Sequence, residues 1–429
     1  MSFNPSRTVL TLTLTGALTA ALVPALAITP TASAATGPAA SGSAGGLASA
    51  GIAAAGGGST SAAGAFVSTR IAAEAGTTSA GRGDAASAGG ATAAPARSLQ
   101  AAAERLVADG QPGVIVLSRR GKQVRHVTAG VADKATGQPM DARLRFRIAS
   151  VTKTFTSTVL LRLVAERRVS LDDTVDKWLP GAVTRHGNDG SKITLRQLLG
   201  HTSGLKDYSL DPRVWADPHR EWKPQELVDM AQETPPSAKG SYSNTNYILA
   251  GMVIEKVTGR PVGKEFQRRI ARPLGLRHTS MAVDRSFPGP YVHGYLAPYG
   301  DVSTEISLSS AWTSGGVIST VDDVATFHRA LFTGRLLPRR LQREMMNTRP
   351  VADGDVTQDY GLGVVKTRFS CGIAWGHDGG FPGYRTWTYT SADGKRQAVI
   401  TYNDNSSAFE TDPKFKADLD KAAETAFCG

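Results

Sequence analysis

The sequence contains little cysteine: Cys371 and Cys428 are its only two in 429 residues. It also has no H-E-x-x-H pattern and no G-x-x-x-x-G-K-[ST] loop, so we expect no metal and no cofactor. Beyond the N-terminal region, no apolar run is long enough to span a bilayer. No basic motif interleaved with aromatic residues occurs that would indicate a nucleic-acid partner.

The first hundred residues differ in composition from the rest of the chain. An apolar run follows Arg7 and ends before a small-residue site at Ala32-Ser33-Ala34, which is typical of a secretory signal peptide over residues 1–34. Residues 35–97 are mostly Ala, Gly, Ser and Thr, and they predict a disordered tether. We expect a folded domain over residues 98–429 in a secreted protein.

The two cysteines form an even pair, which in an exported protein suggests a disulfide. Such a bond would tie a predicted strand to the end of the chain. The cysteine count alone leaves open the alternative of two free, buried thiols.

The formal net charge is +11. Most basic pairs, such as Arg119-Arg120 and Arg339-Arg340, are interpreted as solvated faces. The charge still favours contact with anionic cell-wall polymers.

Predicted strands occur near both ends of the folded part. Val114–Leu117 and Val124–Val131 form an early pair, and Gly361–Val365, Ile373–Gly380 and Val399–Tyr402 follow late in the chain. Helical periodicity dominates between them. This order predicts an α/β (α+β type) domain, in which the two ends of the chain complete one sheet.

The first motif with chemical potential is Ser150-x-x-Lys153, ahead of a helical apolar pattern. Side chains three residues apart share a helix face, so the Lys153 amine can lie beside the Ser150 hydroxyl. The unpaired N–H groups of a helix N-terminus suit an oxyanion forming at Ser150. A serine needs a base to become nucleophilic, and a lysine serves only with a lowered pKa. Taken alone, this spacing more often marks an N-capping serine and an exposed lysine.

A second motif, Tyr242-Ser243-Asn244, precedes an apolar helix. Its phenol can relay a proton, and its amide can orient a substrate carbonyl or a lysine. A polar helix N-terminus is the plain alternative. His201 and Ser203 follow a short helical stretch and precede a glycine, and we interpret them as a capping turn rather than a catalytic pair.

Together with His377-Asp378-Gly379, these motifs occur in the order found in penicillin-recognising serine hydrolases. The stretch from about Ser98 to Cys428 resembles the D-alanyl-D-alanine carboxypeptidases/transpeptidases and the related class C β-lactamases. The resemblance includes Phe146–Lys153, Tyr242–Asn246, His293–Tyr295 and Ser370–Ile373. It implies a β-lactamase/DD-peptidase fold: an antiparallel sheet flanked by helices, plus a mainly helical subdomain.

The resemblance also implies catalytic roles. Ser150 would be the acylated nucleophile, and Lys153 would help to take its proton. Tyr242 would pass the proton to the leaving group, and Asn244 would hold the substrate amide. The backbone N–H groups of Ser150 and Gly380 would form the oxyanion hole.

Further residues are assigned by the same resemblance. His377 stands where most relatives carry lysine, and the cysteine pair matches a disulfide of the family. Trp312, which by itself fits core and pocket wall equally well, matches a pocket tryptophan. Asp378, Gly379 and Gly380 would contact the substrate.

The positions expected to hold a substrate carboxylate depart from the family pattern. Asp378 replaces a threonine, Gly380 replaces a hydroxyl residue, and a pocket arginine aligns near Val365, with Lys366 beside it. An acid at position 378 would repel a terminal carboxylate unless it is protonated or paired.

The resemblance predicts an exported serine hydrolase, similar to D-Ala-D-Ala carboxypeptidases, with an acyl-enzyme on Ser150. Peptidoglycan-type peptides or small acyl compounds would be substrates, and β-lactams would be acylating inhibitors. The departures leave open an esterase, amidase or D-peptidase that acts on substrates lacking a free carboxylate. A β-lactamase and a slow penicillin-binding sensor are further alternatives.

Overall fold

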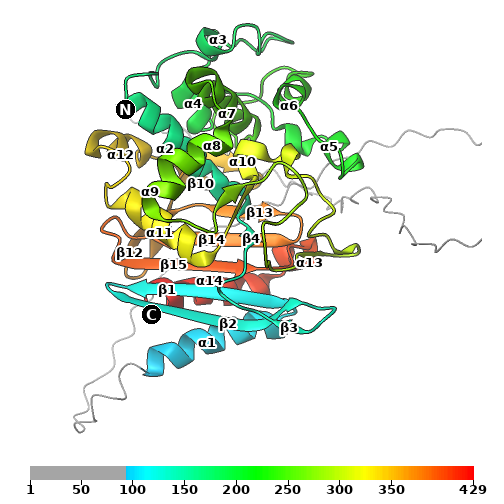
Figure 1. Cartoon of the computed structure of the whole chain (residues 1–429), viewed down its shortest axis with the longest axis vertical. Coiled ribbons are helices and arrows are strands. Elements are labelled where there is room, and N and C mark those ends of the chain that lie inside the picture. Colours follow the sequence, from blue (N-terminus) through cyan, green and yellow to red (C-terminus); the bar gives the residue numbers. More distant parts are fainter. Residues whose placement is uncertain (1–92) are drawn as a thin grey trace, which may run out of the picture. The chain divides into compact units, whose positions relative to one another are not determined.

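A computed structural model describes residues 93–429 of the chain (Figure 1). Its main element is a ten-stranded sheet with the order β3-β2-β1-β15-β14-β12-β11-β10-β9, in which β13 also pairs with β14. The strands are β1 (Gly113–Arg120), β2 (Gln123–Asp133), β3 (Gln138–Pro139), β9 (Arg349–Asp353), β10 (Val356–Tyr360), β11 (Val365–Phe369), β12 (Gly372–Gly376), β13 (Asp378–Phe381), β14 (Tyr384–Thr390) and β15 (Arg396–Tyr402). Neighbouring strands pair antiparallel, as predicted.

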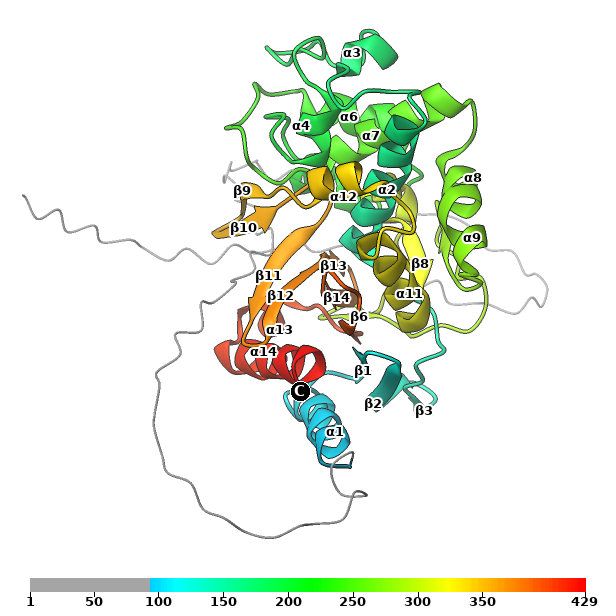
Figure 2. The same ribbon diagram turned by 90° about the vertical axis from the view of Figure 1, so that its left-hand side faces the viewer.

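The two ends of the described chain meet in this sheet. Val116 of β1 lies opposite Ile400 of β15 on one side and Val127 of β2 on the other. Helices α1 (Ala93–Ala108) and α14 (Pro413–Phe427) lie side by side against these strands (Figure 2). Their apolar faces bury Leu99, Ala102, Leu106, Phe415, Leu419 and Phe427. The N- and C-terminal segments therefore stabilise each other through one shared core.

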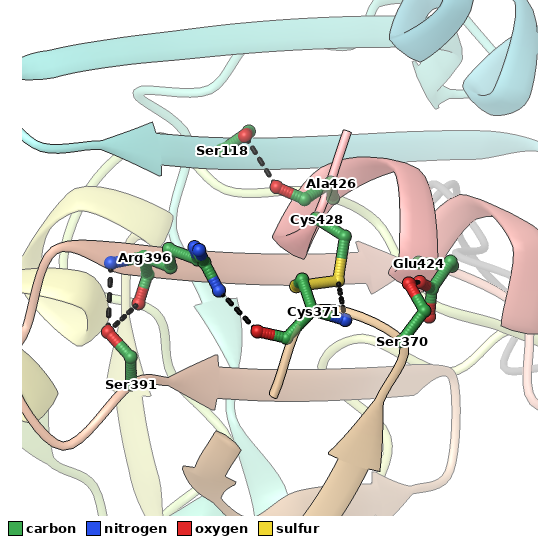
Figure 3. The surroundings of a disulfide bond; sticks show 8 residues. All are labelled: Ser118, Ser370, Cys371, Ser391, Arg396, Glu424, Ala426 and Cys428. Atoms are coloured by element: carbon green, nitrogen blue, oxygen red, sulfur yellow. Dashed lines mark hydrogen bonds between the residues drawn. A yellow bond between two sulfur atoms is a disulfide. The ribbon is translucent and has the colours of Figure 1, made fainter. Parts of the chain in front are cut away.

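A disulfide joins Cys371, before β12, to Cys428 at the end of α14, with their Cα atoms 5.6 Å apart (Figure 3). Close by, the hydroxyl of Ser118 in β1 donates to the carbonyl of Ala426 at 2.6 Å. The covalent bond and this hydrogen bond both attach the closing helix to the sheet.

Helices make up much of the chain between β3 and β9, where the strands are short. They are α2 (Thr152–Ala165), α3 (Val175–Trp178), α4 (Leu195–Leu199), α5 (Arg213–Ala216), α6 (Pro224–Ala231), α7 (Thr245–Thr258), α8 (Val262–Phe266), α9 (Arg272–Leu274), α10 (Trp312–Gly315), α11 (Val321–Phe332) and α12 (Arg339–Met345). The central pair is α2 and α7, which pack on each other and on α10. Both helices are buried over most of their length, so their polar residues need partners inside the core.

Some boundaries differ from those predicted. Helix α1 begins at Ala93, ahead of Ser98, where the domain was expected to start. The predicted strand Gly361–Val365 is wrong, because most of it connects β10 to β11. Gly363 has a φ of 83°, and its carbonyl accepts the Thr154 hydroxyl of α2 at 2.7 Å.

The predicted signal peptide and nearly all of the predicted tether lie outside the described residues. Within residues 93–429, no helix has the length and apolar composition that crossing a bilayer requires.

Candidate active site

Ser150 lies in the 3₁₀ turn η1 (Ala149–Val151), directly ahead of α2. Ala149 has a φ of 49°, a left-handed conformation that costs free energy for a residue with a Cβ atom. Strand β13 packs so closely against this turn that a Cβ atom built on Gly379 would be 2.9 Å from the Ser150 nitrogen. Glycine therefore lets the β13 backbone approach the Ser150 N–H, as an oxyanion hole requires.

Lys153 is buried beside Ser150. Its Nζ lies 3.0 Å from the Ser150 Oγ, 2.6 Å from the Asn244 Oδ1 and 2.9 Å from the Ser314 carbonyl. Burial lowers the pKa of Lys153 to about 7, because the charged amine loses its hydration. A neutral amine has two N–H groups and one lone pair. The Asn244 Oδ1 and the Ser314 carbonyl can accept the two hydrogen bonds. The lone pair can then face the Ser150 hydroxyl and accept its proton.

Asn244 links Lys153 to an acid. Its Nδ2 donates to the Asp207 Oδ2 at 2.9 Å and to the Ser209 Oγ at 3.1 Å. Burial raises the pKa of Asp207. When Asp207 is ionised, its charge favours the protonated form of Lys153. Both ends of the Asn244 amide contact protein groups, and its contact with a substrate amide stays a prediction.

Tyr242 covers the Lys153 amine, with its ring centroid 4.8 Å from Nζ. Burial raises the pKa of Tyr242 well above its ordinary value, and the charge of Asp353 acts in the same direction. A hydrogen bond with Ser150 opposes these two effects. The phenol therefore stays protonated at neutral pH and can donate a proton.

His201, in the predicted capping turn, contacts the second motif, and this contact was not predicted from the sequence. The His201 ring contacts the Tyr242 ring, with 4.3 Å between the centroids and the ring planes tilted by 32°, and the His201 Nδ1 accepts the Ser243 N–H at 3.1 Å. Burial lowers the pKa of His201, so the ring is neutral. The Ser203 hydroxyl donates to Asn246 rather than to this histidine. His201 and Ser203 therefore form no catalytic pair, as predicted.

His377 is a neutral group in this structure, since burial lowers its pKa to about 4. Its Nδ1 contacts the Asp378 carbonyl, and its Nε2 lies 2.9 Å from the Tyr360 hydroxyl. A neutral imidazole has one N–H, and a carbonyl only accepts, so Nδ1 donates and Nε2 accepts from Tyr360. The position that the resemblance assigned to a lysine in most relatives therefore carries no positive charge.

Asp378 is paired, and its partner is Arg385 rather than Lys366. The Asp378 Oδ2 accepts from the Arg385 Nη2 at 2.9 Å. Arg385 lies in β14 directly opposite Gly380, and a Cβ atom on Gly380 would be 2.5 Å from the Arg385 Nη1. The missing side chain at position 380 therefore gives the buried guanidinium room to reach Asp378.

The sequence profile of the family described as Beta-lactamase matches residues 99–423. The chain belongs to the beta-lactamase family of serine hydrolases. This membership confirms the predicted fold class, a large antiparallel sheet with helices.

Two solved structures similar to this beta-lactamase family member are of proteins whose names specify the D-configuration. The D-stereospecific amidohydrolase from Streptomyces sp. is 40% identical, with a TM-score of 0.69 over 78% of this chain and 98% of that chain. The D-amino acid amidase from Ochrobactrum anthropi SV3 is 28% identical, with a TM-score of 0.70 over 77% of this chain and 97% of that chain.

Two curated proteins are also similar. Penicillin-binding protein 4* from Bacillus subtilis (strain 168) is 27% identical over 341 residues, which cover 74% of this chain and 72% of that protein. A D-aminopeptidase from Brucella anthropi is 26% identical over 68% of this chain. The match spans 56% of the D-aminopeptidase's own length.

The beta-lactamase family chain carries a further acid at the site, Asp353. It follows Ala352, whose carbonyl accepts the Tyr242 N–H at 2.8 Å. Burial raises the pKa of Asp353 to about 7, and the neighbouring charge of Asp378 adds to that effect. The charges of Asp207, Asp353 and Asp378 all act on Lys153. Three carboxyl groups therefore favour the protonated form of the base when they are ionised.

The structure brings most of the predicted site residues together around Ser150, including Lys153, Asn244 and Tyr242. Trp312 is 7% exposed and belongs to the main hydrophobic core, while Ser314 of the same helix holds Lys153. The substrate contact of Trp312 stays a prediction.

Sequence reasoning missed Asp207, Asp353 and Arg385. Asp207 lies shortly after His201 and Ser203, which were predicted to form only a capping turn. Asp353 and Arg385 lie in strands that the sequence analysis did not identify. Arg385 could have been located only by expecting the strand that follows His377-Asp378-Gly379 to pair with the next strand of the chain.

Proposed function

We propose that the protein is a serine amidohydrolase for D-amino acid amides and short peptides with a free N-terminal D-residue. The observation that carries the proposal is the excess of carboxyl groups around Ser150. Asp207, Asp353 and Asp378 are opposed by Lys153, whose pKa is low, and by Arg385, which Asp378 already pairs. Burial raises the pKa of Asp207 and of Asp353, so a substrate ammonium group beside them would favour their ionised forms, whereas a free carboxylate would meet no such attraction.

The acylation step follows from the proposed roles. Neutral Lys153 takes the Ser150 proton while Oγ attacks the amide carbon, and the backbone N–H groups of Ser150 and Gly380 stabilise the oxyanion. Protonated Tyr242 gives its proton to the leaving nitrogen as the C–N bond breaks, and the proton on Lys153 restores Tyr242. Water then attacks the acyl-enzyme by the reverse use of the same groups.

The names of the relatives support the substrate class. The Streptomyces amidohydrolase and the Ochrobactrum amidase are named for D-configured substrates and amide bonds. Activity of the D-Ala-D-Ala carboxypeptidase type is the second candidate, and the similarity to penicillin-binding protein 4* favours it. The neutral His377 and the Asp378–Arg385 pair argue against it, because neither residue offers an uncompensated positive charge to a terminal carboxylate.

We also propose that the protein is exported. The Cys371–Cys428 disulfide supports this location, because such bonds persist in oxidising compartments. N-terminal sequencing of the protein secreted by the native host would test the proposal. A mature chain that begins close after Ala34 is the expected result, and an uncleaved protein in the cytoplasm would contradict it.

A substrate panel tests the enzymatic proposal. The compounds are D-alaninamide, L-alaninamide, N-acetyl-D-alaninamide, N-acetyl-D-Ala-D-Ala and a chromogenic cephalosporin, with Ser150→Ala as the blank. We expect D-alaninamide to have the highest kcat/KM. Preference for N-acetyl-D-Ala-D-Ala would assign a carboxypeptidase, and fastest turnover of the cephalosporin would assign a β-lactamase. A stable label from a fluorescent penicillin without turnover of any amide would assign a sensor.

A further inference from the structure

A second concave site lies in the segment from η3 (Gln267–Ala271) through α9 to β5 (Ser280–Met281). Figure 2 shows α9 of this segment beside α11. The cavity has a volume of about 480 Å³, which is within the range of small-molecule sites. Its lining is Arg145, Gln267, Ala271, Arg272, Gly275, Leu276, Arg277, His278, Thr279, Ser280 and Pro288. Three of these side chains are arginines, and none of these described lining residues is acidic.

The arginines of this segment fall into two groups. Arg268 and Arg269 form ion pairs with Glu265, at 2.8 and 2.6 Å. Arg272 and Arg277, which line the cavity, have no ion pair with any residue from 93 to 429. The segment therefore neutralises the arginines outside the cavity and leaves those that line it uncompensated.

The third arginine, Arg145, is fixed in place by the backbone. It forms a parallel bridge with Tyr291, and its N–H donates to the Pro290 carbonyl at 3.2 Å. A Cβ atom on Gly289 would lie 2.5 Å from the Arg145 Nη1, so glycine makes room for the guanidinium. The Arg145 Nε is buried and has no hydrogen-bond partner among the described residues. A buried donor without a partner costs free energy, and because Arg145 also lines the cavity, an anion bound there would offset that cost electrostatically.

Asp323 of α11 contacts the lining through two hydrogen bonds. The Asp323 Oδ2 accepts the His278 N–H at 2.8 Å and the Thr279 hydroxyl at 2.8 Å. These bonds hold the cavity wall to α11. Three guanidinium groups around one cavity repel one another unless an anion lies between them.

We propose that this cavity is a binding site for a phosphate-type oxyanion, held by Arg145, Arg272 and Arg277. A planar guanidinium donates two parallel hydrogen bonds to such an anion, which a lysine cannot do. The ligand is either a small soluble phosphate or the phosphodiester backbone of a cell-surface polymer. The site is separate from the Ser150 centre, since none of its lining residues belongs to the catalytic set.

Isothermal titration of the full chain with sodium pyrophosphate tests the proposal. The variant is Arg272→Gln/Arg277→Gln, and the matched control is Arg339→Gln/Arg340→Gln, which removes the same charge from exposed positions of α12. We expect the Kd to weaken at least tenfold in the cavity variant and less than twofold in the control. Both variants should keep wild-type hydrolysis of D-alaninamide, which shows that they fold.

A second variant, Arg272→Lys/Arg277→Lys, keeps the charge and removes the planar donors. Its Kd should weaken at least threefold. A parallel titration with poly(glycerol phosphate) identifies the source: tighter binding than pyrophosphate, per phosphate, assigns a polymer, and equal or weaker binding assigns a free phosphate. No binding of either probe to the wild type overturns the proposal, as does an equal loss in the α12 control.

Discussion

Two regions of the active site, one at the nucleophile and one at a strand hairpin, differ in how far their sequence predicts them. On the nucleophile side, Ser150, Lys153 and Asn244 form one hydrogen-bonded chain, with the spacing and partners that the motifs predicted. On the opposite side, the β13–β14 hairpin carries the Asp378–Arg385 pair, which no motif predicted. The comparison indicates that acyl-transfer chemistry and substrate charge are set by separate elements.

The electrostatic character of the two sides also differs. Lys153 has its pKa lowered to about 7 by burial, so it serves as a base. Arg385 is a permanent cation whose charge is compensated by Asp378. A change on the nucleophile side should therefore abolish chemistry for every substrate, whereas a change on the hairpin side should reorder the substrates.

The largest effect is expected for Ser150→Ala. Loss of the nucleophile should reduce kcat by about 10⁴-fold or more for every substrate, while the unfolding temperature stays within a few degrees of wild type. Mass spectrometry after exposure to penicillin should find no covalent adduct. An adduct of undiminished yield on this variant would place the nucleophile elsewhere.

On the hairpin side, Arg385→Gln should destabilise the protein by about 3 kcal/mol, because it leaves the Asp378 carboxylate partly buried and unpaired. The double variant Asp378→Asn/Arg385→Gln should recover at least half of that loss. Urea unfolding of wild type, both single variants and the double variant gives the coupling energy. Additive effects would show that the two side chains do not interact.

These two sides also mark what the sequence could predict. The Ser150–Lys153 contact follows from a helix turn, so local spacing suffices. The Asp378–Arg385 contact depends on the pairing of β13 with β14 and on the missing side chain of Gly380, neither of which local periodicity reveals.

Longer-range contacts limited the prediction in other places. Asp207 reaches the site through Asn244, which lies 37 residues later in the sequence. The strand predicted at Gly361–Val365 was wrong because Gly363 turns in the left-handed region to meet α2. The overall antiparallel sheet was predictable because the strands near both chain ends are strongly apolar.

A smaller effect concerns pH. Because Lys153 must be neutral, kcat/KM should rise with pH through a midpoint near 7, the pKa of that amine. The Asp207 charge favours protonated Lys153, so Asp207→Asn should lower this pKa and move the midpoint down by roughly 0.5–1 unit. Glu221→Gln, an exposed substitution, serves as the control and should leave the midpoint unchanged. An upward shift in Asp207→Asn would contradict the assignment of Lys153 as the base.

The most direct test of the central claim, that the hairpin sets the charge of the substrate, compares D-alanyl-D-alaninamide with D-alanyl-D-alanine. In the wild type Asp378 forms an ion pair with Arg385, so the Arg385 charge is not available to a substrate carboxylate. The value of kcat/KM should therefore favour the amide at least tenfold, which corresponds to about 1.4 kcal/mol. Asp378→Thr removes the carboxylate that pairs with Arg385, so the Arg385 charge can act on a substrate carboxylate, and the ratio should shift towards the free acid by a further tenfold or more. A wild type that prefers the free acid, or a ratio that is the same in Asp378→Thr, would contradict the account.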